Sequence, residues 1–246
     1  MFKFLHAADI HLDTQPSGLH GYPAEVASLL RDAPLEAFDN LVREALRQEV
    51  SFCVFAGDIY DGADRGTRAE LAFRRGLHQL AEAGIRSFIV HGNHDPIDTG
   101  WSTVSTWPKE VTVFRAREPE TVVFDVDGTT VAVQGVSYAG RDTTDNLATR
   151  FRRHDGADVQ IGVLHTNAGS NPDHARYAPC SLDDLRAVGA RLLGAWPRAH
   201  AREPRRAEAV GGVPGQPPGP PRQAVRAGRQ GRDGRDRDRL RRHRGA

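Results

Sequence analysis

Four apolar stretches of the chain each end in side chains that can bind a metal ion. In order, these side chains are Asp9 and His11, Asp58 and Asp61, Asn93, His94 and Asp95, and His165. Each pattern alone is common, because turns after strands often hold aspartate and a single histidine is more often structural than a ligand. Four segments with the same feature indicate one shared site, since open α/β sheets place their sites at the carboxyl edge.

The residue types indicate which cations this site would hold. Carboxylate, amide and imidazole ligands together suit Mn²⁺, Fe or Zn²⁺ better than Ca²⁺. In a two-metal site the cations lie about 3.5–4 Å apart and make a water acidic enough to yield hydroxide near neutral pH. Two such cations share a bridging carboxylate. We expect Asp58 to bridge, because it follows an apolar run typical of a central buried strand.

The first part of the chain alternates between predicted strands and helices. We expect strands at 3–8, 51–57 and 85–92 and helices at 34–50 and 65–83, with Pro34 in the first turn of its helix. This alternation is typical of parallel strands joined by crossover helices.

The next part is richer in β-structure, and here we expect antiparallel strands. Strands are predicted at 111–116 and 159–167, and residues 121–138 hold the hairpin turn Asp127-Gly128. A short helix at 181–189 would be capped by Ser181, with Asp184 three residues further on.

The motifs D-x-H, G-D-x-x-D and G-N-H-D, in this order, resemble the calcineurin-like metallophosphoesterase superfamily. The stretches "LHAADIHLD" and "HTNAGSNPDHARYAPCSLDDL" resemble its SbcD-type DNA-repair exonuclease branch. The resemblance covers nearly all of residues 1–189. It implies an α/β fold in which a β-sandwich is flanked by helices (αββα layers), incomplete at the C-terminus.

The resemblance also implies a role for each ligand. Asp9 and His11 would hold the first metal, Asp58 would bridge, and Asn93 and His165 would hold the second. The metal expected is Mn²⁺, with Fe or Zn²⁺ as alternatives.

Two further residues would serve the reaction itself, which is attack of hydroxide on a phosphodiester. His94 would face the scissile phosphate as general acid or charge stabiliser, and Asp95 would orient His94. Asp61 lies close in sequence but receives no definite role. Two other functions stay open: hydrolysis of small substrates such as nucleotides or cyclic nucleotides, and a non-catalytic remnant that binds nucleic acid or a partner.

One motif of the superfamily, G-H-x-H, does not occur in this sequence. From Ala190 to the end the chain contains no Ser, Thr, Asn, Lys, Ile, Phe, Tyr or Met, and Arg, Gly, Ala and Pro dominate. We expect this segment to be disordered, because it cannot bury enough apolar surface to offset its chain entropy. The expected domains are therefore a truncated nuclease domain at 1–189 and a tail at 190–246.

The genetic code offers an explanation for the missing motif. Trp196 has one codon, TGG, and the codon of Pro197 begins with C, so a reading frame one base later encodes glycine there. Codon degeneracy then permits the string R-D-Y-W-A-L-G-H-V-H, and "VPGQPPGPPRQ" can likewise read F-P-G-N-L-Q-G-R-H. Our hypothesis is a one-base insertion near Gly189, which makes the tail an out-of-frame translation and impairs activity.

The charge of the chain is unevenly distributed. Residues 190–246 hold 15 arginines against five acidic residues, a formal charge of +10, which leaves −9 on residues 1–189. An arginine-rich arm that binds nucleic acid is therefore the alternative interpretation of the tail.

The remaining expectations concern partners and location. DNA is the expected substrate, and the resemblance suggests an SMC-like ATPase partner, whose docking region we expect to be absent. The chain shows no signal peptide and no apolar run of membrane-spanning length, so we expect a cytoplasmic protein without a membrane partner. Its two cysteines, Cys53 and Cys180, indicate no disulfide framework.

Overall fold

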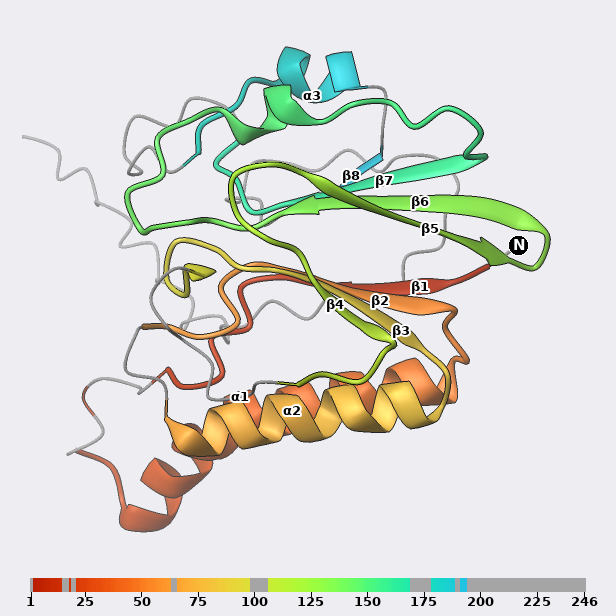
Figure 1. Ribbon diagram of the computed structural model, residues 1–246. Coiled ribbons are helices and arrows are strands. Elements are labelled where there is room, and N and C mark those ends of the chain that lie inside the picture. Colours follow the sequence, from red (N-terminus) through yellow and green to blue (C-terminus); the bar gives the residue numbers. More distant parts are fainter. Residues whose placement is uncertain are drawn as a thin grey trace, which may run out of the picture. The chain divides into compact units, whose positions relative to one another are not determined.

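Two four-stranded sheets pack face to face, with helices on their outer faces (Figure 1). The computed structural model describes residues 2–14, 18, 21–62, 66–97, 106–168, 178–188 and 191–193. These residues form helix, sheet, sheet and helix layers, which confirms the expected α/β sandwich. No helix in this part of the chain is long and apolar enough to cross a membrane.

The first sheet is entirely parallel. The strand–helix alternation predicted this for its first three strands, whereas the strand predicted at 111–116 was expected in the antiparallel part and joins this sheet in parallel. Its strands, in spatial order, are β1 (Phe4–Ala7), β2 (Phe52–Ala56), β3 (Arg86–Val90) and β4 (Val111–Val113). The two long helices α1 (Ala24–Arg47) and α2 (Thr67–Glu82) cover its outer face. Each helix is a crossover connection between neighbouring parallel strands.

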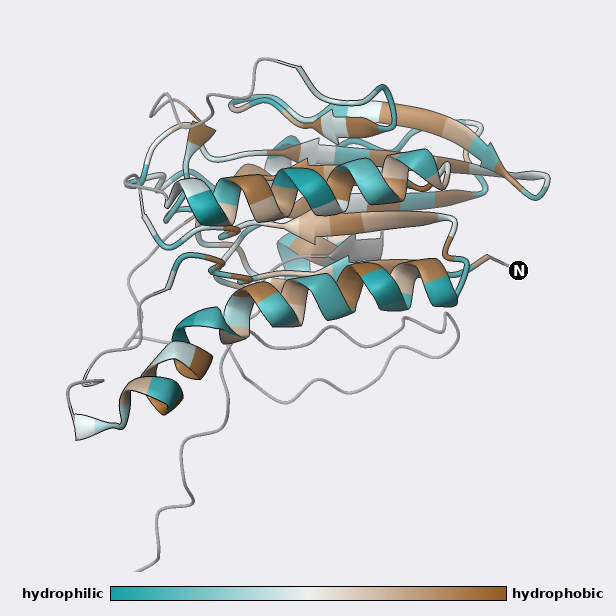
Figure 2. Ribbon diagram, turned by 90° about the horizontal axis from the view of Figure 1, so that it is seen from below, coloured by the Kyte–Doolittle hydropathy of each residue, from teal (hydrophilic) through white to brown (hydrophobic). Residues whose placement is uncertain are grey.

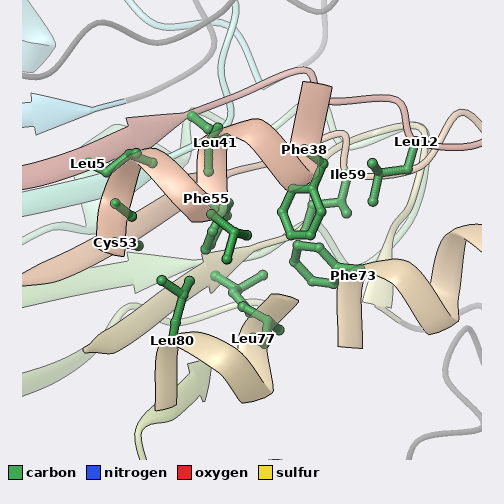
Figure 3. Packing of buried hydrophobic residues seen from close by; sticks show 14 of the residues in the cluster. Leu5, Leu12, Phe38, Leu41, Cys53, Phe55, Ile59, Phe73, Leu77 and Leu80 are labelled. Atoms are coloured by element: carbon green, nitrogen blue, oxygen red, sulfur yellow. The ribbon is translucent and has the colours of Figure 1, made fainter. Parts of the chain in front are cut away.

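Aromatic and aliphatic side chains fill the layer between these helices and the first sheet. Phe38 of α1 and Phe73 of α2 lie with ring centroids 5.3 Å apart, and both rings pack against Phe55 of β2 (Figure 3). Along both helices apolar and polar residues alternate with helical periodicity (Figure 2). The buried stripe of each helix is therefore what attaches it to the sheet.

The second sheet is mixed, not antiparallel as expected. Its order is β5 (Glu120–Val126), β6 (Thr129–Val136), β7 (Val159–Leu164) and β8 (Arg191–Leu193). Only β5 and β6 pair antiparallel, through the predicted turn, in which Asp127 has φ 50° and Gly128 φ 76°. The connections from β6 to β7 and from β7 to β8 are long crossovers, so each strand starts again from the same end of the sheet. β7 therefore pairs parallel with β6, and β8 pairs parallel with β7.

Short helical segments cover the outer face of the second sheet. They are η3 (Leu147–Arg150) and α3 (Leu182–Val188). The Ser181 hydroxyl accepts a hydrogen bond from the Asp184 N–H at 3.0 Å, and the Asp184 carboxylate accepts one from the Ser181 N–H at 2.8 Å. This reciprocal pair confirms the predicted helix start.

An apolar core joins the two sheets. Phe52 and Phe88 of the first sheet contact Phe124 of the second, with ring centroids 5.5 and 5.3 Å from it. Valines and Ile161 of β6 and β7 complete this core. The carboxyl ends of β1, β2, β3 and β7 are thereby held in one fixed arrangement.

The structure adds to the predictions at two places. Helix α1 begins at Ala24, ten residues before Pro34, because residues 24–33 are good helix formers. These residues carry no buried stripe that the sequence pattern could reveal, since Val26 and Leu29 are 38% and 65% exposed. The tail expected to be disordered begins with strand β8, because the edge of β7 accepts Arg191–Leu193 as a further strand. Residues 194–246 lie outside the described residues.

Candidate metal centre

The loops that follow β1 and β2 run side by side and carry three of the predicted ligands. The N–H of Asp9 donates to the carbonyl of Gly57 at 3.1 Å, and the N–H of His11 donates to the carbonyl of Asp58 at 3.1 Å. Parallel strands end at the same edge of their sheet, so residues about fifty positions apart in sequence become neighbours.

The backbone is strained at these three ligands. Asp9, His11 and Asp58 have φ values of 50°, 47° and 49°, in the left-handed region that residues with a Cβ rarely adopt. Such conformations cost about 1–3 kcal/mol each and persist only where surrounding contacts enforce them. Here the two paired loops enforce them, and strain of this kind gathers at functional sites.

The inner part of the site joins Asp9, Asp58 and His165. Their ligand atoms lie within 4.8 Å of one another, and Asp58 and His165 are buried. The Nε2 of His165 lies 3.2 Å from Oδ2 of Asp58 and 3.1 Å from Oδ1 of Asn93. Its Nδ1 lies 3.2 Å from the carbonyl of Ala56, which leaves Nε2 facing the site.

Burial and the contact between Asp58 and His165 have opposite effects on the pKa values of these two residues. Burial would lower the pKa of His165, but the hydrogen bond and charge of Asp58 outweigh burial and raise it to about 9. Burial would raise the pKa of Asp58, but contact with His165 holds it below its ordinary value. Burial raises the pKa of Asp9. Without a cation, the proton on His165 therefore compensates the Asp58 carboxylate.

The outer part of the site joins His11, Asp61 and His94, whose ligand atoms also lie within 4.8 Å of one another. Oδ1 of Asp61 lies 3.3 Å from Nδ1 of His11 and 3.1 Å from Nδ1 of His94. The hydroxyl of Thr14 donates to Oδ2 of Asp61 at 3.3 Å, and Oδ1 of Asp13 accepts the N–H of Asp61. Asp61, to which the sequence assigned no role, thus connects two imidazoles; its place in G-D-x-x-D was the available signal.

Asp58 lies between the inner and outer groups. Its Oδ2 is 3.2 Å from Nε2 of His165 and 3.9 Å from Nε2 of His11, and its Oδ1 accepts the N–H of His94 at 3.0 Å. One carboxylate therefore faces imidazoles that were predicted to hold different metals.

Asp95 does not orient His94, contrary to the role that the resemblance implied. It is fully buried and accepts hydrogen bonds from the N–H groups of Gly92 at 2.8 Å and Ile59 at 3.0 Å. Its Oδ2 lies 3.0 Å from Nδ1 of His91, a buried residue that sequence reasoning missed. The turn after β3 directs Asp95 inward and His94 outward, so Asp95 fixes the loops while Asp61 contacts His94.

Two glycines make room for the inner group. A Cβ at Gly57, where φ is 86°, would collide with the ring of His165, and a Cβ at Gly92 would collide with Asp58 and His165. The close approach of three strand ends depends on these two positions.

Comparison with known proteins supports the same interpretation. The family described as calcineurin-like phosphoesterase matches residues 2–184.

The chain belongs to this family.

Two relatives illustrate how far the similarity of this calcineurin-like phosphoesterase extends. The metallophosphoesterase YhaO of Bacillus subtilis is 32% identical over 198 residues, which is 80% of this chain and 48% of that protein. The DNA double-strand break repair protein Mre11 of Methanopyrus kandleri is 26% identical, over 86% of this chain and 47% of that protein. The chain thus spans about half the length of these two relatives.

Two solved structures are distantly similar to the chain. The protein TT1561 of Thermus thermophilus has a TM-score of 0.43 at 14% identity, and the match covers 78% of this chain and 80% of that protein. A dimetal phosphatase from Danio rerio has a TM-score of 0.33 at 18% identity, and the match covers 63% of this chain and 48% of that protein.

The residues of this calcineurin-like phosphoesterase fit divalent cations. The inner group offers two carboxylates, one imidazole and the amide of Asn93, and the outer group offers one carboxylate and two imidazoles. Hard oxygen and borderline nitrogen donors in this ratio suit first-row divalent cations. The family is one of phosphoester hydrolases, and the two groups contain the candidate metal ligands.

Proposed function

We propose that this chain is a metal-dependent phosphodiester hydrolase of the DNA-repair exonuclease type, with Mn²⁺ as its metal. The observation that carries the proposal is the position of Asp58, whose single carboxylate faces both His11 and His165. In the proposed assignment Asp9 and His11 would hold one cation, Asn93 and His165 would hold the other, and Asp58 would serve both. Similarity to proteins named Mre11 supports DNA as the substrate.

Two bound cations would activate a water for attack and offset negative charge on the phosphate. The chain's own residues would donate the proton and position the reacting groups. His94 has a side chain 42% exposed, and its Nδ1 faces Asp61, so its Nε2 is available to donate a proton to the departing oxygen. Asp61 positions the His94 ring, and Asp95, through Gly92 and Ile59, holds the loops on which Asp58 and His94 stand.

The experiment that tests this proposal is Mn²⁺ titration by calorimetry. Asp58→Ala should abolish uptake at the two-cation centre, because it removes the carboxylate common to both cations. Asp155→Ala is the matched control, since Asp155 is exposed on the loop that precedes β7, at the opposite edge of the sheet. Unchanged uptake by Asp58→Ala would refute the two-metal assignment.

The substrate is tested separately, because small phosphoesters remain an alternative. We expect cleavage of single-stranded DNA or duplex ends to exceed cleavage of a cyclic nucleotide. The reverse preference would leave the hydrolase in place and overturn DNA as the substrate. DNA binding that does not depend on metal would instead favour the non-catalytic alternative. A partner ATPase and a cytoplasmic location remain parts of the proposal.

A further inference from the structure

An arginine lies beside the open side of the candidate metal centre. Nη2 of Arg141 is 3.7 Å from the position that a Cβ at Gly62 would occupy, and Gly62 directly follows Asp61. The side chains of Asp61 and His94 are each 42% exposed, whereas those of Asp58 and His165 are 5% and 9% exposed. The more exposed side of the centre is therefore the one formed by Asp61 and His94, and the Arg141 guanidinium lies near Gly62, which adjoins Asp61 in the chain.

The segment that carries Arg141 is attached to the loop that carries Asn93 and His94. The N–H of Tyr138 donates to the carbonyl of His91 at 3.0 Å, and the N–H of Ile97 donates to the carbonyl of Tyr138 at 2.9 Å. The hydroxyl of Thr143 donates to the carbonyl of Gly140 at 2.8 Å and closes the turn around Arg141. These hydrogen bonds thus fix the backbone that carries the Arg141 guanidinium relative to the metal centre.

Within the described part of the chain, no carboxylate pairs with the positive charge of Arg141. Several other arginines there have carboxylate partners: Arg47 pairs with Glu44, Arg68 with Asp32, Arg75 with Asp39 and Arg150 with Asp145. Arg141 forms no such ion pair among the described residues. An arginine fork that has no carboxylate partner matches the oxygens of a phosphate group in charge and geometry.

We propose that Arg141 binds non-bridging oxygens of the substrate phosphodiester at the rim of the metal centre. This inference rests on the proposed function and adds to it a residue that recognises the phosphate without holding a metal. Because the guanidinium lies near Gly62, which adjoins Asp61 in the chain, it would hold the phosphate within reach of the proton donor.

The test measures binding of a fluorescein-labelled single-stranded oligonucleotide with ordinary phosphodiester linkages by the full chain in Mn²⁺, read before cleavage products form. We expect Arg141→Ala to weaken binding by about tenfold, the loss of one charge-assisted contact, and Arg141→Lys to weaken it less. Arg74→Ala is the matched control, since Arg74 is an exposed arginine on α2. Mn²⁺ uptake by calorimetry should be unchanged in all three variants.

The two readouts separate the inference from the proposed function. Normal Mn²⁺ uptake with unchanged oligonucleotide binding in Arg141→Ala would overturn the role of Arg141 alone, and so would an equal loss in Arg74→Ala. Uptake of Mn²⁺ by the unaltered chain without oligonucleotide binding would overturn both this role and DNA as the substrate. Failure of the unaltered chain to take up Mn²⁺ would overturn the proposed function itself.

Discussion

At the scale of single residues, His165 shows how a buried ion pair prepares a cation site. Its Nε2 is held 3.2 Å from Asp58 and 3.1 Å from Asn93, and its pKa is raised to about 9. The proton on His165 neutralises the charge of Asp58, which a bound cation would otherwise do through the oxygens of Asp58 and Asn93. Cation uptake and proton loss are therefore coupled at this residue.

The coupling predicts the pH dependence of metal binding. A raised pKa means that His165 is protonated at pH 7, and only the neutral imidazole binds a cation. Mn²⁺ uptake at pH 7 should thus release about one proton from His165, and the affinity should rise with pH until the pH approaches about 9.

Calorimetry in two buffers of different ionisation enthalpy measures the released proton. The apparent binding enthalpy should differ between the buffers, and His165→Gln should reduce the difference. An identical enthalpy in both buffers would contradict the coupling.

At the scale of elements, the ends of β2, β3 and β7 meet so closely that glycine is needed between them. Gly57 follows β2 and packs against His165, which follows β7, while Gly92 follows β3 and packs against Asp58. The ladders that fix β2 and β3 in the first sheet and β7 in the second determine how far each end projects. The site is accordingly sensitive to small changes of volume that leave every ligand in place.

Gly92→Ala tests this sensitivity. The added methyl group would overlap Asp58 and lie 2.9 Å from Cδ2 of His165, so either the loop or Asp58 must move. We expect unfolding free energy to fall by about 1–3 kcal/mol and Mn²⁺ affinity to fall with it.

Denaturant unfolding and calorimetry measure the two effects. Gly21→Ala is the matched control, because a Cβ there would meet nothing within 4 Å. Equal behaviour of the two variants would show that the strand ends tolerate the extra volume.

At the scale of the whole molecule, the chain lacks one metal-binding motif of its superfamily. The second sheet carries β8 at its edge, and the motif G-H-x-H, to which the resemblance assigns one histidine for each metal, does not occur in the sequence. Loss of contacts that merely support ligands costs about 10–100-fold in metal affinity or activity, and loss of ligands should cost more. We propose that the domain folds and holds most of its site, but turns over slowly.

This proposal makes one prediction about the gene and one about the protein. The nucleotide sequence near codon 189 should contain a frame, one base away, that encodes Gly-His-Val-His. The chain as given should show little Mn²⁺-dependent cleavage of bis(p-nitrophenyl) phosphate, and restoring the frame should raise cleavage by more than about 100-fold.

Sequencing of that stretch and a colorimetric assay check the two statements. A clean open frame without the motif in the neighbouring frame would end the insertion hypothesis. Robust cleavage by the unrestored chain would contradict the loss of activity.

The sequence by itself determined which residues could lie together in one site. Apolar strands can be recognised from their composition, and the carboxyl ends of parallel strands lie at the same edge of a sheet. For the same local reasons the sequence predicted the hairpin at Asp127-Gly128 and the capped helix at Ser181, whereas the αββα layers were implied by the family resemblance. Only the tertiary structure decided which partner each side chain has. Asp61, not Asp95, contacts His94, and Arg141 reaches Gly62, because the directions of side chains on turns depend on packing between distant strands that no local pattern encodes.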